Sequence, residues 1–202
     1  QTCALPILSV SASANGPQLS GEGLSAIRQM RDVESAMPLQ LETGKVEAGV
    51  AAVETIICGI DAGANQLISL EAAYGRLLNR QDIQSSAYVC VVDQSIATKT
   101  YRRDNITGKH ITLNLYGKTE TFLVVGVAKA GSSLLQNITN FMPGFVYVPY
   151  TVAQQFTGKE TFQQIAVRIR PGTDADLLSQ QVVKTLERTA RLPSRNTGLF
   201  KA

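Results

Sequence analysis

Two amphipathic helical patterns, one near each end of the chain, enclose a middle section of strand patterns, and this arrangement restricts the fold more than any other feature. Near the N-terminus, one apolar stripe of helical spacing is formed by Leu24, Ile27, Met30 and Val33. Pro38 is expected to end this short helix, because proline cannot continue helical geometry and disfavours it in the preceding residue.

A strand followed directly by a helix forms the last section of the chain. Ile165, Val167 and Ile169 alternate with other residues, which predicts a strand with one buried face. The proline and glycine at 171–172 predict a turn, and Thr173 is a candidate N-cap for the helix that follows. The buried stripe of that helix is expected to contain Leu178, Val182 and Leu186.

The middle section is rich in short apolar segments that predict strands. These segments cover residues 39–42, 46–60, 88–92, 111–115, 122–127 and 145–148. A turn at 116–118 is expected to join two of them into a hairpin. Short helices are predicted after Asp93, a candidate N-cap, and over residues 151–156.

This order of patterns predicts an α+β protein with two lobes. We expect a βαβ-type lobe built from both chain ends, residues 8–72 and 160–202, and a mostly β lobe inserted at 73–159. Residues 1–7 are interpreted as a translated sequencing adaptor, since the sequence starts at Gln1 rather than Met. The alternative is an ordinary N-terminal strand, because Leu5, Ile7 and Leu8 are apolar.

The charge and the few metal-binding residues exclude several classes of protein. A net charge of +3, from 19 basic and 16 acidic residues, is too small for electrostatic binding of nucleic acid. One histidine, His110, and 3 cysteines exclude a clustered zinc site and a dense disulfide scaffold. Cys58 and Cys90 lie in different predicted strands; they either pair or remain buried free thiols, and we expect free thiols. No apolar run approaches the ~20 residues that span a bilayer.

Catalytic motifs are missing from the sequence. A triad-type mechanism would have to use His110, and no recognisable nucleophile motif accompanies it. Residues 126–133 have the glycine spacing of a phosphate-binding loop, but Ser132 stands where the lysine is required. The sequence therefore predicts a non-enzymatic domain without a metal or cofactor.

Six short motifs follow one another in an order that is known from one family. They lie at residues 58–61, 74–77 together with Asp82, 89–97, 106–111, 122–127 and 146–153. In this order they resemble the extracytoplasmic core domain of ABC-transporter permeases of the MacB-like and FtsX-like type. The motif residues to which we assign structural roles are Gly59, Gly75, Arg76, Asp82, Gly108, Gly126 and Pro149.

The resemblance implies a place and a function. In such permeases this domain lies between the first and second transmembrane helices, outside the cytoplasmic membrane, and has a two-lobed, porter-like fold. It implies attachment to the membrane through flanking helices that this stretch of sequence lacks, a cytoplasmic ABC ATPase as a separate domain or subunit, and a permease homodimer or heterodimer. A periplasmic adaptor or an extracellular partner is also implied. The expected role is to couple movement of membrane helices to a partner or cargo outside the membrane.

A polar segment at 129–143 contains apolar residues that are candidate contacts for that partner or cargo. They are Leu134, Leu135, Ile138 and Phe141. The alternative for this segment is an ordinary packed surface loop. Two other functions stay open: a free-standing secreted module that binds a peptide or cell-wall ligand, and a hydrolase that depends on His110.

Overall fold

The structure is a computed structural model that describes residues 7–12, 18–131, 144–190 and 200–201. Its helices and strands confirm the α+β class. The chain forms two compact units: unit 1 contains Gln1–Leu39 and Glu160–Ala202, and unit 2 contains Gln40–Lys159. The first boundary lies after Leu39, whereas the sequence analysis places it after residue 72. The reason for the difference is that the strand at Ala51–Ile60 pairs with the strand at Phe145–Pro149, which belongs to unit 2.

Unit 1 is built on one small antiparallel sheet. Strand β9 (Gln164–Ile169) pairs with β1 (Ile7–Ala12) on one side and with the first part of β2 (Val33–Ala48) on the other. Strand β10 (Phe200–Lys201) adds to the outer edge of β1. Sequence segments from both ends of the chain therefore share this sheet, because β9 is the centre of the pairing.

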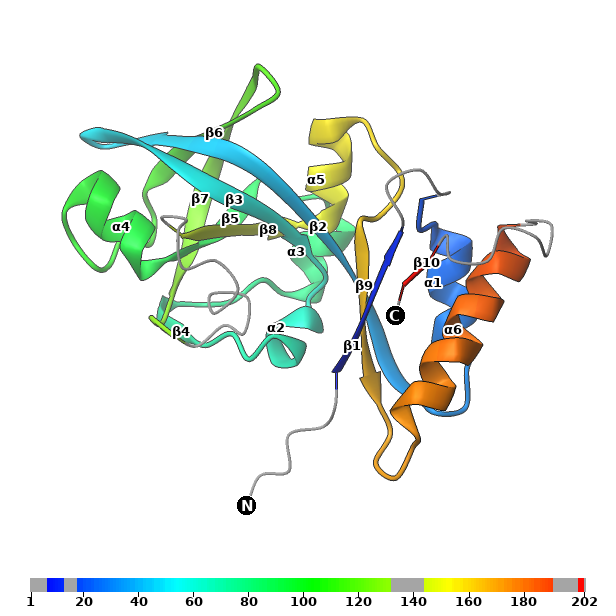
Figure 1. Ribbon diagram of the computed structural model, residues 1–202. Coiled ribbons are helices and arrows are strands. Elements are labelled where there is room, and N and C mark those ends of the chain that lie inside the picture. Colours follow the sequence, from blue (N-terminus) through cyan, green and yellow to red (C-terminus); the bar gives the residue numbers. More distant parts are fainter. Residues whose placement is uncertain (1–6, 13–17, 132–143, 191–199, 202) are drawn as a thin grey trace. The chain divides into compact units, whose positions relative to one another are not determined.

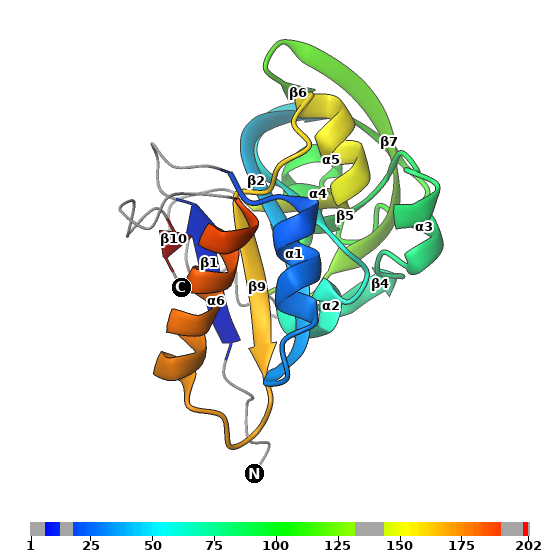
Figure 2. The ribbon, with the colours of Figure 1, turned by 90° about the vertical axis from the view of Figure 1, so that its right-hand side faces the viewer.

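Two helices cover one face of the unit 1 sheet, as Figure 2 shows. Helix α1 (Gly21–Arg28) lies beside α6 (Ala175–Thr189). Their contact is close at Gly23, where an added Cβ would lie 2.8 Å from a methyl carbon of Leu186. The buried side chains of this unit include Val10, Leu24, Ile27, Ile165, Val167, Ile169, Leu178, Val182 and Leu186. The predicted stripe of the last helix is thus confirmed.

Three predictions at the ends of these helices are wrong. Helix α1 ends at Arg28, and Val33 begins strand β2 instead of closing the helical stripe. Pro38 lies inside β2, opposite Ile165 of β9. Strand pairing overrides the local helical spacing here, because β propensity depends on tertiary context. The N-cap of α6 is Asp174, not Thr173, since the Asp174 side chain accepts hydrogen bonds from two backbone N–H groups of the first turn.

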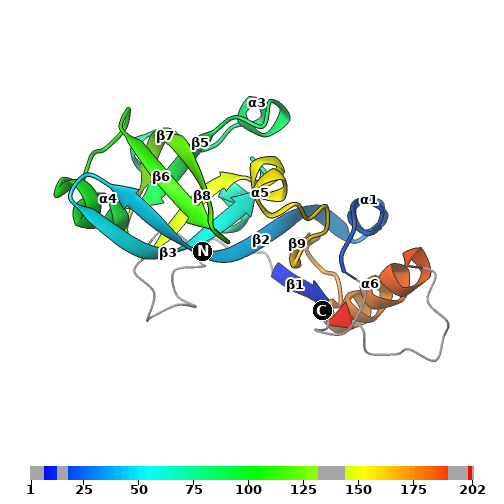
Figure 3. The ribbon, with the colours of Figure 1, turned by 90° about the horizontal axis from the view of Figure 1, so that it is seen from above.

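Unit 2 is a ring of six paired strands (Figures 1 and 3). The strands besides β2 are β3 (Ala51–Ile60), β5 (Val89–Asp93), β6 (His110–Leu115), β7 (Lys118–Ala128) and β8 (Phe145–Pro149). Going round the ring, β2 pairs with β3, then β8, β5, β7 and β6, and β6 pairs again with β2. Closure removes the open edges of the sheet. The predicted hairpin is confirmed as β6 and β7.

Apolar side chains fill the ring, and short helices lie around it. The buried cluster includes Val46, Cys90, Val92, Ile111, Leu113, Phe122, Val124, Val146, Val148 and Phe156. The helices are α2 (Ala64–Leu67), α3 (Arg80–Gln84), α4 (Gln94–Tyr101) and α5 (Tyr150–Thr157), and β4 (Ala72–Gly75) pairs with β7. None of the helices in the described part of the chain is long and apolar enough to cross a membrane.

Candidate functional site

The motif residues of the sequence analysis all lie in unit 2, and the first group of them forms a tight backbone crossing. Gly75 has φ +67°, and a Cβ there would lie 2.2 Å from the carbonyl oxygen of Val125. A Cβ on Gly126 would lie 2.0 Å from the carbonyl oxygen of Arg76. The backbone N–H of Arg76 donates to the Val125 carbonyl at 2.9 Å. Only glycine fits at both positions, because any side chain would collide with the facing backbone.

Arg76 and Asp82 hold the segment that follows this crossing. The Arg76 guanidinium donates two hydrogen bonds to the Asp82 carboxylate, at 2.6 and 3.1 Å. That carboxylate also accepts from the backbone N–H of Asn79, and the Asn79 side chain accepts from the N–H of Asp82, which makes a capping box at α3. Burial alone would raise the pKa of Asp82. The hydrogen bonds from Arg76 and Asn79 and the charge of Arg76 outweigh burial and lower that pKa.

The remaining motif residues are placed at turns and packing contacts. A Cβ on Gly59 would lie 2.7 Å from the Cβ of Ala153, so this glycine allows α5 to approach β3. Gly108 has φ +86° in the turn before β6. Pro149 is the last residue of β8 and the N-cap position of α5. The geometry gives each of them a role in the fold and no reactive group.

The four candidate contact residues lie outside the described residues; they are Leu134, Leu135, Ile138 and Phe141. The structure does describe the start of β8, at residues 144–145. The Asp93 carboxylate accepts from the Phe145 N–H at 2.8 Å, and the Thr55 hydroxyl donates to the Gly144 carbonyl at 2.8 Å. Asp93 occupies the N-cap position of α4, but its side chain makes no capping bond there. Its carboxylate instead fixes the start of β8.

A polar cluster lies beside the residues where the chain passes between the units. Glu42 is only 5% exposed, yet it accepts a hydrogen bond from the Tyr116 hydroxyl at 2.5 Å. The Lys159 ammonium lies 3.8 Å from the other Glu42 oxygen and 5.7 Å from the centre of the Tyr116 ring. Nearby, the Gln40 amide donates to the Thr157 hydroxyl at 3.1 Å. Within unit 2, these contacts join the beginning of the unit to its end.

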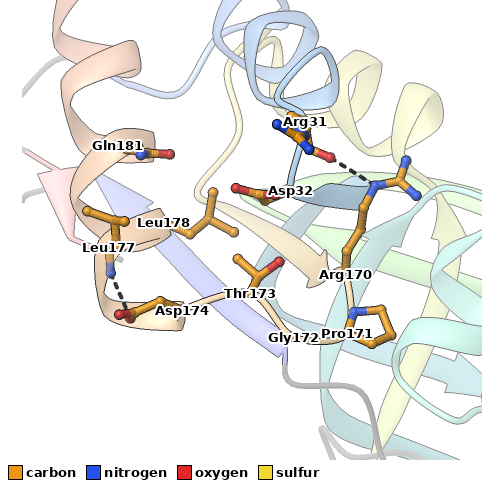
Figure 4. A pocket seen from close by; sticks show the side chains of 10 residues that line it. All are labelled: Arg31, Asp32, Arg170, Pro171, Gly172, Thr173, Asp174, Leu177, Leu178 and Gln181. Carbon is orange, nitrogen blue, oxygen red and sulfur yellow. Dashed lines mark hydrogen bonds between the residues drawn. The ribbon is translucent and has the colours of Figure 1, made fainter.

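A pocket of about 720 Å³ opens in unit 1 (Figure 4). One wall is the loop before β2, and the other is the turn from β9 into the first turns of α6. Leu178 lies at its base, and Leu177 and Gln181 line it from the helix. The lining residues are Arg31, Asp32, Arg170, Pro171, Gly172, Thr173, Asp174, Leu177, Leu178 and Gln181.

Hydrogen bonds hold the two walls of the pocket together. The Nε–H of Arg170 donates to the carbonyl of Arg31 at 2.9 Å, and the backbone N–H of Arg170 donates to the carbonyl of Asp32 at 2.9 Å. One oxygen of Asp174 accepts from the backbone N–H of Asp176 and of Leu177, at 3.0 and 3.1 Å. The pocket therefore has a fixed frame, with charges of both signs on its lining.

The sequence analysis did not identify this pocket. Of its lining residues, that analysis names only the proline and glycine of the predicted turn, Thr173, as a helix cap, and Leu178, in a buried stripe. Arg31 and Arg170 are far apart in the chain, so only the strand pairing of β2 with β9 brings them together. One signal was available: Leu177 is apolar but lies beside the buried stripe of α6 rather than in it, and it is 53% exposed.

Reactive groups elsewhere do not form a site in the described residues. Cys58 and Cys90 are free thiols with no exposed surface. Burial raises the pKa of both, and the Asp93 charge adds to this for Cys58. His110 is exposed at the start of β6, where its carbonyl accepts from the Tyr101 hydroxyl. Across the described ranges, no three His, Cys, Asp or Glu side chains gather as metal ligands would.

Sequence comparisons relate the chain to one transporter family. The family model of the MacB-like periplasmic core domain matches residues 5–185. The macrolide export ATP-binding/permease protein MacB of Agrobacterium fabrum is 30% identical over 158 residues, which is 77% of this chain and 23% of that protein. MacB of Hahella chejuensis is 26% identical over 165 residues, 81% of this chain and 24% of that protein. The chain thus spans about a quarter of the length of these relatives.

Solved structures show the same fold at low sequence identity. The periplasmic region of MacB from Actinobacillus actinomycetemcomitans gives a TM-score of 0.76 at 19% identity, covering 96% of this chain and 86% of that one. The extracellular domain of the transporter YknZ from Gram-positive bacteria gives a TM-score of 0.79 at 14% identity, covering 97% and 98%.

Proposed function

Because the chain belongs to the family of MacB-like periplasmic core domains, we propose that it carries movement of a permease's membrane helices to a partner or cargo outside the membrane. It is an extracytoplasmic domain of a MacB-like ABC transporter permease. The chemical work would be done elsewhere, with ATP hydrolysed by a cytoplasmic domain or subunit. The domain itself would be a mechanical and binding element, not an enzyme.

The strand directions in unit 1 carry this proposal. Strand β1 begins at Ile7, opposite Arg168 near the end of β9. Strand β10 is antiparallel to β1 and therefore runs back toward the end of the sheet where β1 begins. A segment entering through β1 and one leaving through β10 would thus reach the membrane at the same end of the sheet. A displacement of β1 would pass directly into β9 through the strand pairing, and a displacement of β10 would reach β9 through β1.

Unit 2 is inserted between two parts of unit 1, and this connection also supports the proposal. The chain passes from unit 1 to unit 2 within β2, after Leu39, and returns after Lys159. The Glu42, Tyr116 and Lys159 contacts hold these two passages at one place in unit 2. Rigid units joined at a few residues are the usual basis of hinge movement.

The partners follow from the same premise. We propose a cytoplasmic ABC ATPase, a permease homodimer or heterodimer, and a periplasmic adaptor or extracellular partner. The contact residues proposed for partner or cargo remain Leu134, Leu135, Ile138 and Phe141. Replacing Leu134 and Leu135 with Ser should reduce transport in the full-length permease without unfolding it, and unchanged transport would remove this part of the proposal.

The mechanical role is tested by loosening one passage between the units. A Gly-Ser-Gly insertion between Lys159 and Glu160 in the full-length permease should leave ATP hydrolysis in place and lower the amount of substrate moved per ATP. A matched insertion between Arg103 and Asp104, in the exposed loop between α4 and β6, should leave this ratio unchanged. Equal transport by the two insertion variants and the parent permease would contradict the mechanical role.

A further inference from the structure

The unit 1 pocket lies at the end of the sheet where β1 begins. Val33 at the start of β2 is opposite Ile169 at the end of β9, and Ile7 at the start of β1 is opposite Arg168. The lining residue Asp32 directly precedes β2, and the lining residue Arg170 directly follows β9. The pocket therefore occurs at the end from which β1 starts and toward which β10 runs.

Two exposed apolar side chains lie at this end of the sheet, and one of them lines the pocket. In the described part of unit 1, the large apolar residues that stay exposed are Ile7, at 40%, and Leu177, at 53%. Ile7 is the first residue of β1, and Leu177 lies in the first turn of α6. Ile7 pairs with Arg168, on the sheet face opposite to the buried Ile165 and Val167, whereas Leu177 lines the pocket. Leu177 is therefore the exposed apolar group that the pocket offers for another group to cover.

The polar groups of the pocket are open for binding. Within the described ranges, no hydrogen bond or ion pair engages the side chains of Arg31, Asp32, Thr173 or Gln181. Figure 4 shows Asp32 and Gln181 on facing sides of the pocket, with Leu178 between them. Arg31 and Asp32 offer adjacent charges of opposite sign. A ligand of one sign only would leave half of these charges without a partner, so the lining fits a surface that carries both signs.

We propose that this pocket seats an extracytoplasmic segment of the permease's own membrane part, with an acidic side chain facing Arg31, a basic one facing Asp32 and an apolar one against Leu177. This inference rests on the proposed function. The chain spans about a quarter of the length of its relatives, and the pocket lies at the end through which the rest of the protein would connect. The contact would give membrane movement a second route into unit 1, through α6 as well as β1.

A site-specific photo-crosslinker tests the proposal in the full-length permease. The crosslinking residue replaces Leu177 at the pocket, and in a matched control it replaces Arg188, which is exposed on the same helix roughly 16 Å further along its axis. Membrane association and transport are measured first for both variants. Mass spectrometry then identifies the attached group. We expect a crosslink within one polypeptide, from position 177 to an extracytoplasmic segment of the membrane part, and none from position 188.

Charge reversal tests whether the contact depends on the pocket lining. Asp32→Lys added to the Leu177 crosslinking variant should abolish the intramolecular crosslink, and Arg31→Glu should do the same. Arg188→Glu, as the control, should preserve it. A crosslink that survives both pocket reversals would overturn the charge-dependent docking.

The outcomes separate this inference from the proposed function. A full-length protein that does not associate with the membrane would refute the proposed function. A membrane-bound, transporting permease that crosslinks at position 177 to phospholipid, a second copy or another protein, or to nothing, would overturn the docking inference and leave the proposed function standing.

Discussion

The guanidinium of Arg76 and the carboxylate of Asp82 form a two-bond ion pair, at 2.6 and 3.1 Å, beside the glycine crossing of unit 2. The Asp82 side chain is only 9% exposed, while the Arg76 side chain is 46% exposed. The Asp82 oxygens also accept the Asn79 N–H. The Asp82 side chain therefore joins Arg76, beside the glycine crossing, to the start of helix α3.

Removing the Asp82 carboxylate should destabilise the domain. Asp82→Ala leaves the Asn79 N–H and the Arg76 guanidinium without this acceptor, and the expected loss is about 2 kcal/mol. Urea unfolding followed by circular dichroism measures it. The control is Glu71→Gln, which breaks an ion pair at 3.7 Å between two largely exposed side chains, and should cost no more than about 0.5 kcal/mol. Equal losses for the two variants would contradict the structural role of Asp82.

The Asp82 contribution should depend on pH in acid. The folded state lowers the pKa of Asp82, so its contribution is complete above the pKa of the unfolded chain and is lost as pH falls through the lower folded value. The difference in unfolding free energy between the parent protein and Asp82→Asn should therefore be constant from about pH 7 to pH 5 and shrink below about pH 4. Urea titrations at stepped pH test this. A difference that grows toward acid would show that the folded state does not lower the pKa of Asp82.

Gly126 should not tolerate a side chain. A Cβ at this position would lie 2.0 Å from a backbone oxygen, and backbone cannot move aside as a flexible side chain can. Gly126→Ala should lower the unfolding free energy by roughly 3 kcal/mol or more. Gly21→Ala is the matched control, because nothing lies within 4 Å of its Cβ position and it begins helix α1. It should be neutral or stabilising by up to about 1 kcal/mol.

Cys58 and Cys90 should be unreactive until the domain unfolds. Both thiols are buried and their pKa values are raised, so little thiolate is present near neutral pH. In a Cys3→Ser variant, a thiol reagent should not react with the native protein. In urea without reductant, the same reagent should react with both Cys58 and Cys90. Failure to titrate either thiol in urea would indicate a disulfide between them.

Much of the local structure could be predicted from spacing alone. The alternation at residues 165–169 and the stripe of Leu178, Val182 and Leu186 predicted β9 and α6, and both are confirmed. The β6–β7 hairpin was found because an apolar alternation is interrupted by Tyr116 and Gly117, which both have positive φ. These elements are predictable because their signals come from neighbours a few residues apart.

Other predictions failed where distant residues decide. Val33 continues a helical stripe in the sequence, but it belongs to β2 because β9 provides a pairing partner. Asp93 has the chemistry of a helix cap, yet its carboxylate binds the N–H of Phe145 on another strand. In both cases a contact across the fold, and not the local pattern, determined the role of the residue.

The sequence by itself determined the strand and helix periods, the α+β class and the order of motifs that identifies the family, since these depend on side-chain spacing along the chain. Tertiary structure alone decided the closure of the ring, in which β6 returns to β2, and the pocket that joins Arg31 to Arg170. The physical reason is that backbone pairing brings distant segments together without leaving a residue pattern specific to that pair. The binding surface is therefore a property of the fold, although each of its residues is ordinary in the sequence.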